Sequence, residues 1–149
     1  MTASKGVSWR AFAAQAPELA AAVENRFAAH LHHVIGTIRA DGAPRVSGTE
    51  VHVEDGELRI GMMPDAHKLA DVLRDPRVEV HSAPIDLQLA AGDAKVAGRL
   101  RYSGPPPDGQ PGSMFDLEIE LVSLVRVDGD ELELTTWRPD RGVKTIRRT

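Results

Sequence analysis

The spacing of apolar residues divides the chain into a helical beginning and an alternating remainder. Between positions 9 and 31 apolar residues recur at every third or fourth position, and Pro17 can open a second helix. The residues with this spacing are Trp9, Phe12, Ala13, Ala16, Leu19, Val23, Phe27 and Leu31. We therefore expect two N-terminal helices.

Short alternating segments follow, separated by turn signals. Asp-Gly pairs at residues 41–42, 55–56 and 128–129 lie between segments of strand character, which is typical of hairpins. Helical spacing returns once, in a short segment that carries Leu69, Val72 and Leu73 on its expected buried side. Six or seven mostly antiparallel strands predict a mainly β protein, a closed or half-closed β-barrel with small helices, since closure protects the sheet edges.

The alternation is clearest after a surface loop predicted at residues 104–112. Apolar and acidic residues take turns there, which predicts one buried and one solvated face. The expected buried residues are Phe115, Leu117, Ile119 and Leu121, and the expected solvated ones are Asp116, Glu118 and Glu120.

Composition narrows the class of protein. The 149 residues fit a single domain, 1–149, and a net charge of −4 argues against a nucleic-acid binder held by phosphate contacts. The chain has no cysteine, which excludes disulfides and thiolate chemistry. No segment has the length of a signal-peptide core or a membrane span, so we expect a soluble, cytoplasmic protein.

Two C-terminal features allow alternatives. The last residues carry five basic side chains against the single acid Asp140, which fits a solvated terminus or contact with an anionic ligand or partner subunit. Trp137, just before them, fits either packing at the barrel rim or an aromatic wall for a planar ligand.

One helix start has the character of an anion site. Asp65 is a candidate N-cap, which places His67 and Lys68 in the first turn, where free amides and the helix dipole favour anions. Lys68 would add a mobile positive charge, although Asp65 would occupy some amides and repel a phosphate. A solvated surface lysine is the competing interpretation.

The sequence lacks the motifs of other common metal, catalytic and nucleotide-binding sites. The run His30, His32 and His33 has no carboxylate at a zinc-motif spacing, and His52 and His81 are expected on strand faces, so we expect no metal site. No G-x-S-x-G elbow, P-loop or G-x-G-x-x-G run is present.

An ordered set of residues resembles the FMN-binding split-barrel superfamily, the pyridoxamine 5'-phosphate oxidase-like proteins. Those proteins share a hairpin with glycines and a proline, then a helix with a lysine, then L-x-x-D-P-R-V before the next strand. The resemblance covers residues 30–102 well and the C-terminal third loosely, through Trp137-Arg138-Pro139. The matching residues are Gly36, Gly42, Pro44, Lys68, Leu73, Asp75, Pro76, Arg77 and Val78.

The resemblance implies a split barrel that forms a homodimer, with two FMN sites at the interface. It implies that Lys68 contacts the FMN phosphate and that a strand of four site residues runs along the isoalloxazine. It places two methionines beside the ribityl chain, and a tryptophan and an arginine that reach the flavin from the other subunit. The strand residues are Arg45, Val46, Ser47 and Thr49, and the methionines are Met62 and Met63. The residues from the other subunit are Trp137 and Arg138.

One departure concerns the phosphate site. Many members carry arginine or serine two residues before the lysine, where this chain has Ala66. Because one phosphate donor is missing, three alternatives follow. FMN binds weakly, or His67 helps to hold it, or the protein uses the 8-hydroxy-5-deazaflavin coenzyme of actinobacterial members. The resemblance implies an oxidoreductase that transfers hydride to or from a small molecule. The alternatives are a non-catalytic flavin- or haem-binding carrier module and a dimeric interaction protein whose basic tail binds an acidic partner.

Overall fold

The two N-terminal helices form where the apolar spacing predicts them. In the computed structural model, which describes residues 5–149, α1 (Trp9–Gln15) follows Ser8, whose hydroxyl accepts a hydrogen bond from a first-turn N–H at 3.1 Å. The next helix, α2 (Pro17–Ala28), starts with its proline at the first helical position, where no N–H partner is needed.

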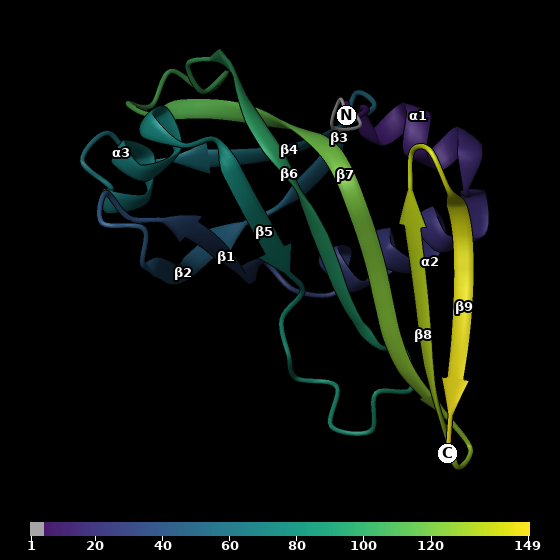
Figure 1. Ribbon diagram of the computed structural model, residues 1–149. Helices are drawn as coiled ribbons and strands as arrows, with labels where there is room; N and C mark the ends of the chain where they lie inside the picture. The colour runs from purple at the N-terminus through teal and green to yellow at the C-terminus, as the bar shows by residue number, and fades with distance from the viewer. Residues whose placement is uncertain (1–4) are drawn as a thin grey trace.

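Antiparallel strands form one curled sheet, and α1 and α2 lie on the side of the molecule that carries β8 and β9 (Figure 1). The hydrogen-bonded order is β2-β1-β5-β6-β7-β4-β3, with β8 paired to β7 and β9 paired to β8. The strands are β1 (His32–Ile38), β2 (Pro44–Glu50), β3 (His52–Glu54), β4 (Glu57–Met62), β5 (Arg77–His81), β6 (Asp93–Gly104), β7 (Ser113–Asp128), β8 (Glu131–Arg138) and β9 (Gly142–Arg148). The mainly β prediction is confirmed, but residues 5–149 hold nine strands instead of six or seven.

The barrel is split along one line. β2 and β4 lie close together, yet no ladder joins β2 to β3 or β4 in the described part of the chain. The predicted Asp-Gly hairpins are present between β1 and β2, between β3 and β4, and between β7 and β8. Asp55 and Gly56 both have positive φ, 53° and 75°, as the two-residue turn between β3 and β4 requires.

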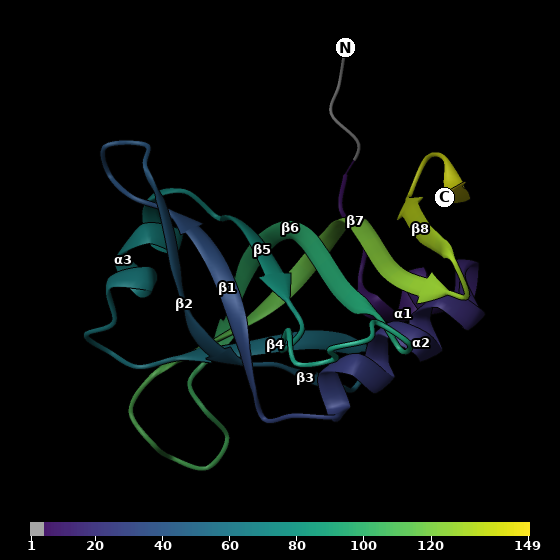
Figure 2. The same ribbon diagram turned by 90° about the horizontal axis from the view of Figure 1, so that it is seen from below.

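The third helix, α3 (His67–Arg74), lies at the opposite end of the molecule from α1 and α2 (Figures 1 and 2). Val72 is buried as expected, but Leu73 is 68% exposed, so its assignment to the buried side is wrong. Asp71 is buried in its place because basic and hydroxyl side chains pair with its carboxylate. Leu31, expected in the helical series, lies beyond α2 and is exposed as well.

The alternation in β7 changes phase at a bulge. Opposite β6, Ala97 pairs with Leu121 and Gly98 pairs with Ile119, so Glu120 is an extra residue on β7. Gly98 is required at this point, because a Cβ there would overlap the carbonyl oxygen of a β7 residue.

The bulge moves the buried face of β7 by one residue. Val122 and Leu124 are buried after it, while Leu121 is only half-buried, so its expected place in the core is wrong. Before the bulge Asp116, expected in solvent, is 5% exposed and accepts a hydrogen bond from Arg59 Nε at 3.1 Å. The buried apolar residues of β7 therefore alternate in one phase up to Ile119 and in the other phase from Val122.

The hydrophobic core is formed by the inner face of the curled sheet together with residues of α1 and α2 and Val72 of α3. Its largest fully buried side chains include Trp137, Phe12, Ile35, Leu58, Ile60, Leu117 and Ile119. Within residues 5–149, no helix is long and apolar enough to cross a membrane.

Candidate functional site

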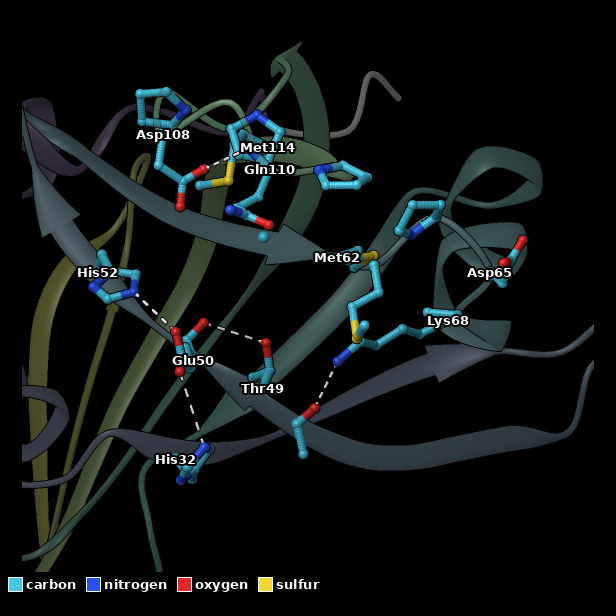
Figure 3. A pocket seen from close by; sticks show the side chains of 18 of the residues that line it. His32, Thr49, Glu50, His52, Met62, Asp65, Lys68, Asp108, Gln110 and Met114 are labelled. Atoms are coloured by element: carbon cyan, nitrogen blue, oxygen red, sulfur yellow. Dashed lines mark hydrogen bonds and ion pairs between the residues drawn. The ribbon is translucent and has the colours of Figure 1, made fainter.

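A groove of about 920 Å³ lies at the split in the barrel (Figure 3). Such a volume is in the range of small-molecule sites. Its walls come from the end of β2, the strands β3 and β4, the start of α3, and the loop between β6 and β7. The lining residues are His32, Gly48, Thr49, Glu50, His52, Glu54, Gly61, Met62, Met63, Pro64, Asp65, Ala66, Lys68, Pro106, Pro107, Asp108, Gln110, Pro111 and Met114.

The start of α3 forms one end of this groove. The N-cap is Ala66, in extended backbone, and no side chain within the described residues caps the helix. The prediction of Asp65 as the N-cap is therefore wrong, because the helix begins one residue later than a cap at Asp65 requires. The first-turn amides stay free of a competing carboxylate, and this end of the groove can receive an anion.

Lys68 bridges the two walls of the split. Its Nζ donates a hydrogen bond to the carbonyl oxygen of Gly48 on β2 at 2.6 Å. Partial burial lowers the pKa of the Lys68 ammonium from its ordinary value. The side chain thus reaches from the first turn of α3 across the groove to β2 (Figure 3).

Arg45 is committed to a structural ion pair. Its Nε donates to Asp71 Oδ2 at 2.7 Å, and the Thr37 hydroxyl donates to the same oxygen at 2.7 Å. Arg74 approaches the other carboxylate oxygen at 3.2 Å. The hydrogen bond from Arg45 is the main reason that the pKa of Asp71 is lowered to about 2. This pair fastens α3 to β1 and β2, and Arg45 does not line the groove.

The structure gathers some of the residues expected at the site and separates others. Thr49, Met62, Met63 and Lys68 line the groove. The others expected there lie outside the lining: Arg45, Val46, Ser47, His67, Trp137 and Arg138. Among them Val46 is 71% exposed on the outer side of β2, and the hydroxyl of Ser47 is buried without a hydrogen-bond partner in the described chain.

Trp137 belongs to the core and is not an aromatic wall. Its side chain is 1% exposed, and its ring centroid lies 4.8 Å from that of Phe12 on α1. The alternation of β8 directs it to the face that α1 covers, so its ring packs in the core and does not line the groove. Arg138, the next residue, is on the other face and exposed.

A second group in the groove was not expected from the sequence. Glu50 Oε2 lies 3.5 Å from His52 Nε2, and Glu50 Oε1 lies 3.9 Å from His32 Nε2 (Figure 3). We call these three residues the Glu50 cluster. The sequence held one indication of this cluster. Glu50 and His52 are two positions apart, so in an extended chain their side chains point to the same side. No group of three His, Cys, Asp or Glu residues among residues 5–149 is arranged to hold a metal ion.

Comparison with known proteins gives counterparts for the fold alone. No family model matches the sequence, and no curated protein is detectably similar to it. A pyridoxamine 5'-phosphate oxidase-related, FMN binding protein from Nostoc punctiforme has a TM-score of 0.64 at 12% identity, over 90% of this chain and 96% of that chain. PhzG from Burkholderia lata, solved in complex with tetrahydrophenazine-1-carboxylic acid, has a TM-score of 0.65 at 9% identity, over 89% of both chains.

A third structure matches over a smaller part. An F420 reductase has a TM-score of 0.51 at 19% identity, over 62% of this chain and 89% of that chain. At identities this low the likeness is one of architecture, and the first two structures share that architecture over nearly their whole length. The chain therefore has the fold of the pyridoxamine 5'-phosphate oxidase-related FMN-binding proteins, as the ordered motif at residues 36–78 predicts.

Proposed function

We propose that this protein is a flavin- or deazaflavin-binding oxidoreductase whose cofactor phosphate binds Lys68 and the first turn of α3. The observation that carries the proposal is a half-buried lysine in the first turn of a helix without a side-chain cap, whose ammonium lies in the groove. Full charge and backbone amides together form a phosphate site.

The groove suits the cofactor at this end. Thr49 and the methionines Met62, Met63 and Met114 continue from Lys68 along its walls, and they offer one hydroxyl and a largely apolar surface. FMN and the 8-hydroxy-5-deazaflavin coenzyme both combine a phosphate with a planar ring system, and either, when bound, would supply hydride transfer. The protein would supply the anchor, the orientation and the exclusion of water.

The proposal includes a homodimer that covers this side of the barrel. Val46, Met63 and Leu73 are 71%, 76% and 68% exposed, on β2, just after β4 and on α3. Large apolar side chains that are this exposed near a groove favour burial against a partner.

A charge-reversing change on α3 tests the dimer. We expect Leu73→Glu to shift the protein from dimer to monomer in sedimentation-velocity runs, because a carboxylate cannot be buried unpaired at the interface. Leu87→Glu is the matched control, since Leu87 is 97% exposed in the loop after β5 and outside the proposed interface. A monomeric wild-type protein would contradict this part of the proposal.

Removal of the Lys68 ammonium tests the cofactor site. We expect the purified protein or its apo form to bind FMN or the deazaflavin coenzyme, followed by the visible spectrum. Lys68→Ala should weaken that binding by about 2 kcal/mol, roughly thirtyfold in Kd, through loss of a charge-assisted contact.

Lys144→Ala is the control for this change, because Lys144 lies on β9 outside the groove. Equal effects of the two substitutions, or no binding of either cofactor, would overturn the proposed site. A cofactor that binds but is not reduced and reoxidised over many turnovers would identify a carrier module instead of an enzyme.

A further inference from the structure

The groove has a second polar end, formed by the Glu50 cluster. Figure 3 shows Glu50 with His32 and His52 on one side of the groove and Lys68 with α3 on the other. The strand pairing fixes part of this arrangement, since His32 of β1 is directly opposite Glu50 of β2. A ligand that occupies the phosphate end leaves this end for a different chemical group.

The Glu50 carboxylate has unused capacity to accept hydrogen bonds. Its oxygens lie 3.5 and 3.9 Å from the two imidazole nitrogens, longer than good hydrogen bonds, and its side chain is 48% exposed. No lysine or arginine among residues 5–149 forms an ion pair with it. A carboxylate offers about four acceptor positions, so this one can receive several donors from a ligand.

The surrounding charge is negative. Away from Lys68 the carboxylates of Glu50, Glu54 and Asp108 line the groove, and no lysine or arginine of the described chain lines it there. Arg59 partly compensates Glu54 at 3.6 Å. A groove lined mainly by one sign of charge concentrates ligands of the opposite sign. An anionic group near Glu50 would be repelled.

We propose that the Glu50 cluster binds the protonated nitrogen of a small organic cation, which defines the second ligand of the groove. The carboxylate pairs with the ammonium, His32 and His52 flank it, and Met62 and Met114 line the groove for the apolar part of the ligand. The identification of this cation as the substrate that meets the cofactor rests on the proposed function. The binding of the cation to the Glu50 cluster does not depend on the proposed function.

Three aromatic probes of similar size and different charge test the inference. Calorimetric titrations of the full-length protein, with and without FMN, would use benzylamine, benzyl alcohol and benzoate at neutral pH, where benzylamine is protonated. We expect benzylamine to bind about tenfold more tightly than benzyl alcohol, and benzoate to bind most weakly. Equal affinities for benzylamine and benzyl alcohol would overturn it.

Glu50→Gln keeps the shape of the side chain and removes its charge. It should reduce the tenfold preference for benzylamine to near unity, while Glu24→Gln, on the exposed side of α2, should preserve it. Far-UV circular dichroism checks that both variants are folded. A preference that survives Glu50→Gln refutes the assignment.

The two proposals fail separately. A benzylamine preference without any cofactor binding supports the cation site and removes the proposed function. Cofactor binding that depends on Lys68, without a benzylamine preference, supports the proposed function and removes the cation site.

Discussion

Asp71→Ala is expected to lower the free energy of unfolding by about 3 kcal/mol, the loss typical of breaking a buried ion pair from one side. The side chain of Asp71 is 4% exposed and that of Arg45 is 23% exposed, so the substitution leaves a poorly solvated guanidinium without its partner. It also removes the acceptor of the Thr37 hydroxyl. Urea unfolding followed by circular dichroism measures the change.

Asp75→Ala is the matched control for this experiment. Asp75 pairs with Arg77 at 2.7 Å, and its pKa is also lowered to about 2, chiefly by hydrogen bonds from Arg77. The Arg77 side chain is 59% exposed, however, so solvent screens the pair. We expect a much smaller loss, and equal losses for the two variants would contradict the structural role of Asp71.

The same ion pair predicts a response to acid. Arg45 and Thr37 lower the pKa of Asp71 from 3.8 to about 2, so the ionised carboxylate is the form that stabilises the fold. Its contribution is complete above pH 3.8 and is lost as the pH falls toward 2. Unfolding curves of wild type and Asp71→Asn should therefore converge over this interval.

Trp137→Ala is expected to lower the free energy of unfolding by about 4 kcal/mol, as for other large aromatic residues removed from a core. The ring is fully buried against Phe12, so its removal leaves a cavity between β8 and α1. Urea unfolding again measures the effect. Trp137→Phe, which keeps part of the volume, should lose less.

Cofactor affinity distinguishes the packing role of Trp137 in the core from the flavin contact expected from the sequence. Because Trp137 lies outside the groove, FMN or deazaflavin binding by folded Trp137→Phe should match that of wild type. A large loss of affinity with unchanged stability would return Trp137 to the cofactor site.

Local patterns predicted most of the elements correctly. The helical spacing before residue 29, the Asp-Gly turns and the alternating segments depend on neighbours in sequence, and α1, α2 and the hairpins formed as expected. β9 was missed because its basic residues mimic a solvated tail, although β8 pairs with it along seven positions.

Several errors came from contacts between residues distant in sequence, unlike the misplaced N-cap of α3, which is a local error of one residue. The bulge at Glu120 depends on its pairing with β6, and no periodicity in β7 alone reveals it. Asp71 is buried because Arg45, 26 residues earlier, folds back onto it. The Glu50 cluster likewise needs β1, β2 and β3 to come together before it exists.

The hydrogen bond from Lys68 to Gly48 has a consequence for ligand affinity. A free lysine side chain gives up roughly 2 kcal/mol of rotamer entropy when a ligand immobilises it. Here the Gly48 carbonyl already restrains the chain through one of the three ammonium donors, which leaves two for a phosphate. The backbone of β2 would thus preorganise the proposed phosphate site, and the Gly48 carbonyl would strengthen ligand binding without touching the ligand.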